Sequence, residues 1–210
     1  MTESAKQAFH ILRQTSNFEW YVIPILMLVL YVYANEVEKR NWNVVFAGLA
    51  FWGMDWFNEI WNGLIFHFTK YAPVWGAPSK TAFSILIGLN IEITFMFAIA
   101  GIVCAKMLPT DKSIKIFGIP NRAFFAVFLS ILFVCIEEIL HAIGVLTWEY
   151  SWWNTTTPWL IFLIGYLPFL VVSFWVHDVP SLKKKISITA TIFMIDAIGL
   201  LLFGVFLHWI

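Results

Sequence analysis

Six apolar runs follow one another along the chain, each close to the 17–25 residues with which a helix crosses a bilayer. They cover roughly residues 19–35, 44–68, 81–107, 121–148, 157–178 and 186–209. Short stretches rich in proline, asparagine and charged residues separate them. The pattern predicts an all-α fold, a polytopic membrane bundle of about six transmembrane helices. Residues 1–18 are more polar and are expected to form an N-terminal interfacial segment, followed by a single transmembrane helical domain over residues 19–210.

Composition supports a membrane-embedded protein. Hydrophobic residues make up 60% of the 210 residues and charged residues only 12%, against about 25% in soluble domains. The formal net charge of zero offers no basic face and so argues against a nucleic-acid partner. The expected partners are membrane lipids and a hydrophobic small-molecule or lipid substrate; the composition specifies no oligomeric state.

Lysine and arginine are unevenly distributed between the connections. The connections near residues 36–43, 106–122 and 178–185 hold nine of the 13 basic residues. Cytoplasmic loops of membrane proteins carry the excess of basic residues, so these three connections are predicted to be cytoplasmic. With six spans, the C-terminus is then non-cytoplasmic.

One apolar run contains a polar stripe. Residues 55, 58, 59 and 62 fall on one face of a helix, and they are Asp55, Asn58, Glu59 and Asn62. A carboxylate near the bilayer centre costs roughly 2.5–3.5 kcal/mol on insertion scales. Two such residues on one helix therefore indicate a face turned toward a protein interior or a hydrated cavity.

Other runs place polar groups at a similar depth. At 1.5 Å per residue, the expected helices bring Asn90 and Glu92, then Glu137, Glu138 and His141, then Asp196, to a slab from the midplane to the outer half. This agreement predicts one shared polar site.

Paired acids in a low-dielectric site suit acid–base catalysis, because crowded carboxyls titrate apart and supply both a proton donor and a base. The predicted catalytic residues are Asp55, Glu59, Glu92, Glu138, His141 and Asp196. Glu59 or Asp55 is expected to donate a proton, Glu138 or Asp196 to accept one, and His141 to orient a carboxylate. The residues expected to bind the substrate are Asn58, Asn62, Asn90, Trp52, Trp56 and Glu137.

The hypothesis is thus a membrane enzyme of the isomerase, lyase or cyclase type that isomerises, cyclises or hydrates an isoprenoid or other lipid-like substrate. In kind, the protein resembles small membrane enzymes that cyclise or isomerise isoprenoids and sterols with a few intramembrane acids. No cofactor is predicted. Glu138-x-x-His141 has the spacing of a metal half-site, so the pattern also allows a single metal ion on Glu138 and His141. Intramembrane acids are also found in proton- or ion-coupled transporters, which is one alternative, and polar helix packing in a non-catalytic membrane subunit is another.

Overall fold

The computed structural model describes residues 1–210, apart from the side chain of Asn17, and most of the chain is helical. The helices are α1 (Glu3–His10), η1 (Thr15–Asn17), α2 (Val22–Glu38), α3 (Trp42–Thr69), α4 (Ile91–Lys106), α5 (Asn121–Ala142), α6 (Pro158–Leu160), α7 (Leu167–Asp178) and α8 (Leu182–Gly199). Two π-helical segments, η2 (Ile161–Tyr166) and η3 (Leu200–Phe206), continue α6 into α7 and extend α8.

Two short antiparallel hairpins are the β-structure of the described residues. One pairs β1 (Ser84–Leu86) with β2 (Leu89–Asn90), and the other pairs β3 (Lys115–Ile116) with β4 (Ile119–Pro120). Both lie in connections between helices. The predicted all-α class is therefore confirmed.

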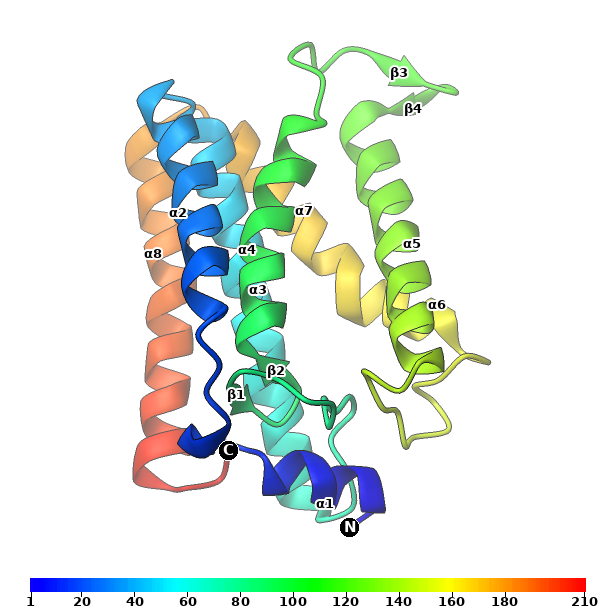
Figure 1. Ribbon diagram of the computed structural model, residues 1–210. Helices are drawn as coiled ribbons and strands as arrows, with labels where there is room; N and C mark the ends of the chain where they lie inside the picture. The colour runs from blue at the N-terminus through cyan, green and yellow to red at the C-terminus, as the bar shows by residue number, and fades with distance from the viewer.

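The long helices run up and down the molecule, and α3 is at its centre (Figure 1). Helix α3 packs against α4, α7 and α8, whereas α5 packs chiefly on α7 and η2. The connections α2–α3, α4–α5 and α7–α8 lie at one end, and α1, β1–β2 and the loop after α5 lie at the other (Figure 1). A cluster of phenylalanine rings, Phe51, Phe97 and Phe169, fills the core between α3, α4 and α7.

Helices α3 and α4 approach each other closely at two glycines. A Cβ atom added to Gly101 would lie 2.7 Å from the carbonyl oxygen of Gly48 and 2.9 Å from its Cα atom. Small residues permit such backbone contact between membrane helices. This contact fixes α4 against the helix that carries the polar stripe.

Three helical segments have the length and hydropathy of a membrane span: Asn121–Ala142, Pro158–Asp178 and Leu182–Phe206. The other long helices fall short of a membrane span in length or in hydropathy. Helices α2 and α4 have 17 and 16 residues. Helix α3 has 28 residues, but its hydropathy is lowered by the buried polar stripe.

Two apolar runs are helical over shorter stretches than their hydrophobicity predicts. The run 81–107 forms a helix only from Ile91, because Asn90 caps the helix by accepting a 2.8 Å hydrogen bond from the Ile93 amide. The run 121–148 leaves the helix after Ala142, where Gly144 takes a positive φ of 78°. Hydrophobicity alone does not distinguish a buried hairpin or loop from a helix.

The predicted interfacial segment contains α1 and η1. Ala5 and Ala8 of α1 are buried against Phe66 of α3 and Ala72 and Ile87 of the following connection. Helix α1 therefore packs across one end of the bundle (Figure 1). Its location at the membrane interface stays a prediction.

Candidate functional site

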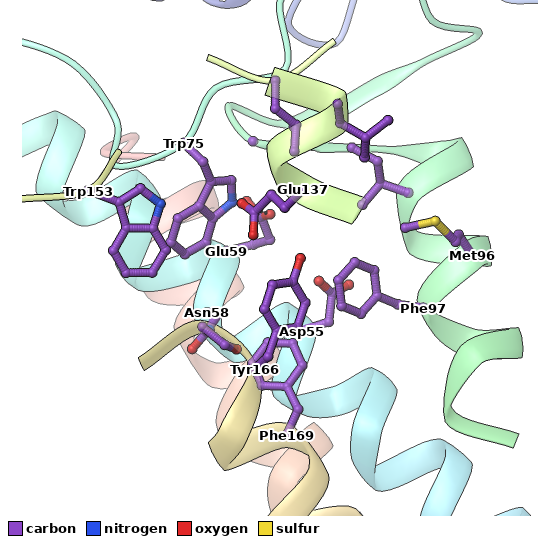
Figure 2. A pocket seen from close by; sticks show the side chains of 15 residues that line it. Asp55, Asn58, Glu59, Trp75, Met96, Phe97, Glu137, Trp153, Tyr166 and Phe169 are labelled. Atoms are coloured by element: carbon purple, nitrogen blue, oxygen red, sulfur yellow. Dashed lines mark hydrogen bonds between the residues drawn. The ribbon is translucent and has the colours of Figure 1, made fainter. Parts of the chain in front are cut away.

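A cavity lies beside the polar stripe of α3. Its walls carry Asp55, Asn58 and Glu59 from α3, Glu137 from α5 and Tyr166 from η2 (Figure 2). The space between its walls is about 540 Å³, including the part open to the outside. Asp55, Glu59 and Glu137 are each at most 6% exposed. Three carboxyl groups from two helices thus meet inside the molecule.

The acidic groups and the tyrosine interact with one another. Glu59 interacts electrostatically with Asp55 and with Glu137. The Tyr166 hydroxyl lies within hydrogen-bonding reach of Glu137 and also interacts with the other two carboxyls. In Figure 2 the carboxyl groups of Glu59 and Glu137 lie beside each other, with the Tyr166 hydroxyl next to them. A proton can therefore be exchanged within this group without a large movement of the backbone.

Glu59 is held by a tryptophan from the α3–α4 connection. The Trp75 indole N–H donates a 2.7 Å hydrogen bond to one carboxyl oxygen of Glu59, and the Asn62 side-chain amide approaches the other oxygen at 3.5 Å. N–H donors favour the ionised form of a carboxyl group. This arrangement suits Glu59 for the part of a base.

Asn62 holds the loop that carries Trp75. Its side-chain oxygen accepts from the Val74 and Trp75 amides at 2.7 and 3.3 Å, and its amide donates to the Trp75 carbonyl at 2.8 Å. Asn62 is fully buried. Its hydrogen bonds go mainly to the backbone, so it positions Trp75 rather than binding a substrate.

We expect Asn62→Leu to lower the free energy of unfolding by about 2–4 kcal/mol, because buried amide groups of Val74 and Trp75 lose their partner. Asn35→Leu is the matched control, since the Asn35 side chain forms no hydrogen bond within the described residues. Thermal unfolding of both variants in the same detergent measures the difference. Equal midpoints would contradict a role of Asn62 in holding the loop.

Asn58 connects α3 to the π-helical segment η2. Its side-chain oxygen accepts a 2.8 Å bond from the Trp61 indole, and its amide approaches the Gly165 carbonyl at 3.5 Å. Pro168 has no N–H for the carbonyl four residues earlier, and the Leu167 amide donates to Phe162, five residues back. The wider turn sets the direction of Tyr166, which ends the segment and lines the cavity.

Asp196 of α8 lies on the other side of Asp55. It is 3% exposed, neither of its carboxyl oxygens has a hydrogen-bond partner within the described residues, and it interacts electrostatically with Asp55. It does not line the cavity. Asp196 therefore joins the acidic group through Asp55 and not through a surface that a substrate can touch.

Aromatic and apolar side chains form the rest of the cavity wall, including Phe97, Trp153 and Phe169. Met96, which is 44% exposed, lines this cavity and also a second, apolar groove between α4 and α5. Phe133 of that groove stacks on Tyr166 with ring centroids 5.3 Å apart. The polar cavity and the apolar groove therefore share a wall.

Several residues predicted for the site lie elsewhere. Glu92 is in the first turn of α4, where it accepts hydrogen bonds from Thr81, the Ala82 amide and the Tyr21 hydroxyl. Asn90 caps the same helix. Depth along the apolar run predicts both near the middle of a helix; this is wrong because the helix begins ten residues later than the run.

Glu138 and His141 also lie outside the cavity lining, whereas their neighbour Glu137 lines it. The Nδ1 atom of His141 lies 3.2 Å from the Leu146 carbonyl oxygen, and its ring stacks on Trp148. The contacts of His141 within the described residues are with a backbone carbonyl and an indole ring, and its role in orienting a carboxylate stays a prediction. In the part of the chain that the structure describes, no three His, Cys, Asp or Glu side chains are grouped as metal ligands, including around Glu138 and His141.

The two tryptophans predicted to bind a substrate do not line the cavity either. Trp52 donates a 2.8 Å hydrogen bond to Thr94 of α4 and packs edge-on against Phe193 of α8. Trp56 is likewise absent from the cavity wall. The indole of Trp52 thus joins α3 to its neighbouring helices rather than facing the space between α3 and α5.

Two residues that contribute polar groups to the site, Trp75 and Tyr166, were missed by the sequence reasoning. Trp75 lies in a connection between apolar runs, and its contact with Glu59 depends on how that connection folds back. Tyr166 could have been identified from the sequence, because Pro168 interrupts an apolar helix and displaces the turn before it.

The fold and the site define an all-helical membrane protein with a buried acidic cavity. The chain belongs to an uncharacterized membrane protein family, whose model matches residues 2–205.

Two proteins of Archaeoglobus fulgidus, each described as an uncharacterized protein, are similar to this chain. One is 56% identical over 209 residues, which is 100% of this chain and 99% of the relative. The other is 45% identical over 53 residues, which is 25% of this chain and 95% of the relative. No solved structure matches the chain.

Proposed function

We propose that the protein is a membrane enzyme that isomerises, cyclises or hydrates a lipid-like substrate by acid–base chemistry. The observation that carries the proposal is the meeting of Asp55, Glu59, Glu137 and Tyr166 around one cavity with aromatic walls. Crowded carboxyls favour a state in which some hold a proton and others are ionised, which supplies an acid and a base together. Aromatic faces can stabilise positive charge that develops on a hydrocarbon.

The contacts suggest which residue accepts a proton and which residue donates one. Glu59, held by the Trp75 indole, accepts a proton from the substrate. Glu137, beside the Tyr166 hydroxyl, donates a proton to another carbon of the substrate. One proton enters and one leaves, so isomerisation and cyclisation leave the composition unchanged, and hydration adds one water. The proton returns from Glu59 to Glu137, directly or through the Tyr166 hydroxyl, which interacts with both carboxyl groups.

The lateral groove supports a substrate that comes from the membrane. It runs along α4 from Glu92 to Met107, about 22 Å at 1.5 Å per residue, and its lining is apolar apart from Glu92. An apolar chain in this groove would extend past Met96 into the acidic cavity.

Met96→Trp should narrow the opening between the apolar groove and the acidic cavity, because the larger ring fills the space beside residue 96. We expect kcat/KM to fall about tenfold or more while the protein stays folded. Met194→Trp is the control, since Met194 is exposed on α8 and lines neither space. Turnover of the substrate by both variants in proteoliposomes makes the comparison. Equal loss in both would contradict entry through this groove.

We further propose that the six long helical segments all cross the membrane, with the connections near residues 36–43, 106–122 and 178–185 in the cytoplasm and the C-terminus outside. The common position of these connections at one end of the bundle is consistent with this topology (Figure 1). Single cysteines introduced at exposed Lys115 and Ser151, in a chain without Cys104 and Cys135, should react with a membrane-impermeant maleimide from opposite sides. Labelling from one side only would contradict it.

The experiment that tests the enzymatic function compares lipids from membranes that contain the wild-type protein with lipids from membranes that contain Glu59→Gln/Glu137→Gln. Untargeted mass spectrometry with chromatographic separation should find a lipid of the same mass but altered retention, or of a mass increased by one water, only with the wild type. Identical lipid profiles from several hosts and from added isoprenoid extracts would count against an enzyme.

Proton-coupled transport is a second candidate, favoured by the continuity of the carboxyl groups. Asp55 interacts both with Glu59 and with Asp196, so the acids form a path across α3. A pH gradient across proteoliposomes should then drive proton flux, which Asp55→Asn abolishes. An enzyme without transport activity would show no flux.

A further inference from the structure

A basic pocket lies at the end of the bundle where α2–α3, α4–α5 and α7–α8 connect. It is lined by Asn43 from the first turn of α3, Lys106 from the last turn of α4, Lys112 from the following connection, Arg122 from the first turn of α5 and Asp178 from the end of α7. The space between its walls is about 1010 Å³, including the part open to solvent. The pocket is separate from the acidic cavity, because Asn43 and Asp55 are 12 residues, or about 18 Å, apart along α3.

One carboxylate holds several of the cations in place. Arg122 donates two 3.0 Å hydrogen bonds to Asp178, and Lys112 lies 3.5 Å from the same carboxylate. His177 contacts it at 2.8 Å. Lys106 pairs instead with the buried Glu36 at 2.6 Å. The lining therefore has three permanent positive charges and one negative charge, with the second carboxylate behind the pocket wall.

Donors remain free for a ligand after these contacts. The Lys106 ammonium group has three N–H donors, and its hydrogen bond to Glu36 uses one of them. The side chain of Asn43 forms no hydrogen bond within the described residues and is exposed at the pocket. The lysines are 47% and 57% exposed, so an anion can reach them without opening the bundle.

This set of groups suits a phosphate better than a single carboxylate. A phosphate presents several strong acceptor oxygens, and arginine and lysine are its usual protein partners. Here the cations come from three separate segments and surround a space far larger than one anion, which leaves room for the group attached to the phosphate. Nine basic and four acidic residues in the three connections add to the local positive field.

We propose that this pocket binds a phosphate group through Lys106, Lys112 and Asn43. Arg122, which is paired with Asp178, forms part of the pocket wall. The phosphate belongs either to the headgroup of an anionic phospholipid or to a soluble phosphate compound. This inference is independent of the enzymatic proposal, because it uses none of the residues of the acidic cavity.

The test measures binding of two probes, phosphatidylglycerol and inorganic pyrophosphate, to the purified full-length protein in a zwitterionic detergent. Native mass spectrometry counts bound phosphatidylglycerol, and the shift of the thermal midpoint reports pyrophosphate. Lys106→Gln/Lys112→Gln should weaken binding about fivefold per lysine. Lys183→Gln/Lys184→Gln removes the same charge from exposed positions at the same end that do not line the pocket.

The two probes distinguish the two possible sources of the phosphate. Binding of phosphatidylglycerol alone that is lost in the Lys106/Lys112 variant supports a lipid headgroup, and stabilisation by pyrophosphate that is lost in the same variant supports a soluble phosphate. Equal weakening in the control variant, or no binding of either probe by the wild type, would overturn the proposal. If loss of the Lys106–Glu36 pair prevents folding, the single variant Lys112→Gln is measured in place of the double variant.

Discussion

Glu137→Gln is expected to lower turnover of the lipid substrate by about 10²–10⁴-fold while the protein stays folded. Glutamine keeps the shape of the side chain and its capacity to interact with Tyr166, but it cannot donate or accept the proton. The residue is buried at the cavity and faces both Tyr166 and Glu59, so its carboxyl group lies where it can exchange a proton with either. The effect should appear in kcat rather than in KM.

The adjacent residue provides a matched control, and it interacts with Glu137 only electrostatically. Glu138 has the same side chain on the same helix but does not line the cavity, so Glu138→Gln should change turnover less than threefold. The comparison also separates two hypotheses, because the sequence offers Glu138 or Asp196 as the base, whereas Glu137 is the residue of this pair that lines the cavity. If both substitutions were silent, the acids would serve helix packing and the enzymatic proposal would fail.

The second large effect is expected on stability. Arg122→Leu should lower the free energy of unfolding by about 3 kcal/mol or more, because Asp178 loses a bidentate partner in a partly buried position. Arg122 also donates to the Pro109 carbonyl and to Asn121, each at 2.6 Å. One side chain therefore joins α5 and α7 and closes the connection between α4 and α5.

Thermal or denaturant unfolding in detergent measures the loss. Arg122→Lys should be intermediate, since lysine retains the charge but cannot form the paired hydrogen bonds. In a double-mutant cycle with Asp178→Asn, the combined loss should be smaller than the sum of the single losses. Strict additivity would show that the pair contributes nothing of its own. Lys183→Leu, at an exposed position of α8, controls for removal of a charge at this end.

The residues behind these predictions are only partly visible in the sequence. The apolar runs located the long helices, and the 55, 58, 59, 62 spacing placed four polar groups on one face of α3. In the structure, all four are buried, and three of them line the cavity. Local periodicity is enough for this, because a helix determines by its own geometry which of its residues share a face.

The sequence could not show whether Glu92, Glu138 and His141 lie at the cavity. Depth along an apolar run suggested that they meet the stripe, but the cap at Asn90 moves Glu92 to a helix end. Glu137 and Glu138 are neighbours that point about 100° apart on the helix, and the choice between them depends on the rotation of α5 about its axis. That rotation is set by packing on α7 and η2.

The sequence by itself determined the helical membrane class, the polar face of α3 and the basic character of three connections, because each follows from residues close together in the chain. Only the tertiary structure decided that Glu137 and Tyr166 complete the acidic site, that Trp75 folds back onto Glu59, and that Asp196 lies behind Asp55. These contacts join residues that are 16 to 141 positions apart. They depend on how whole helices rotate and pack, and no local pattern of residues specifies that.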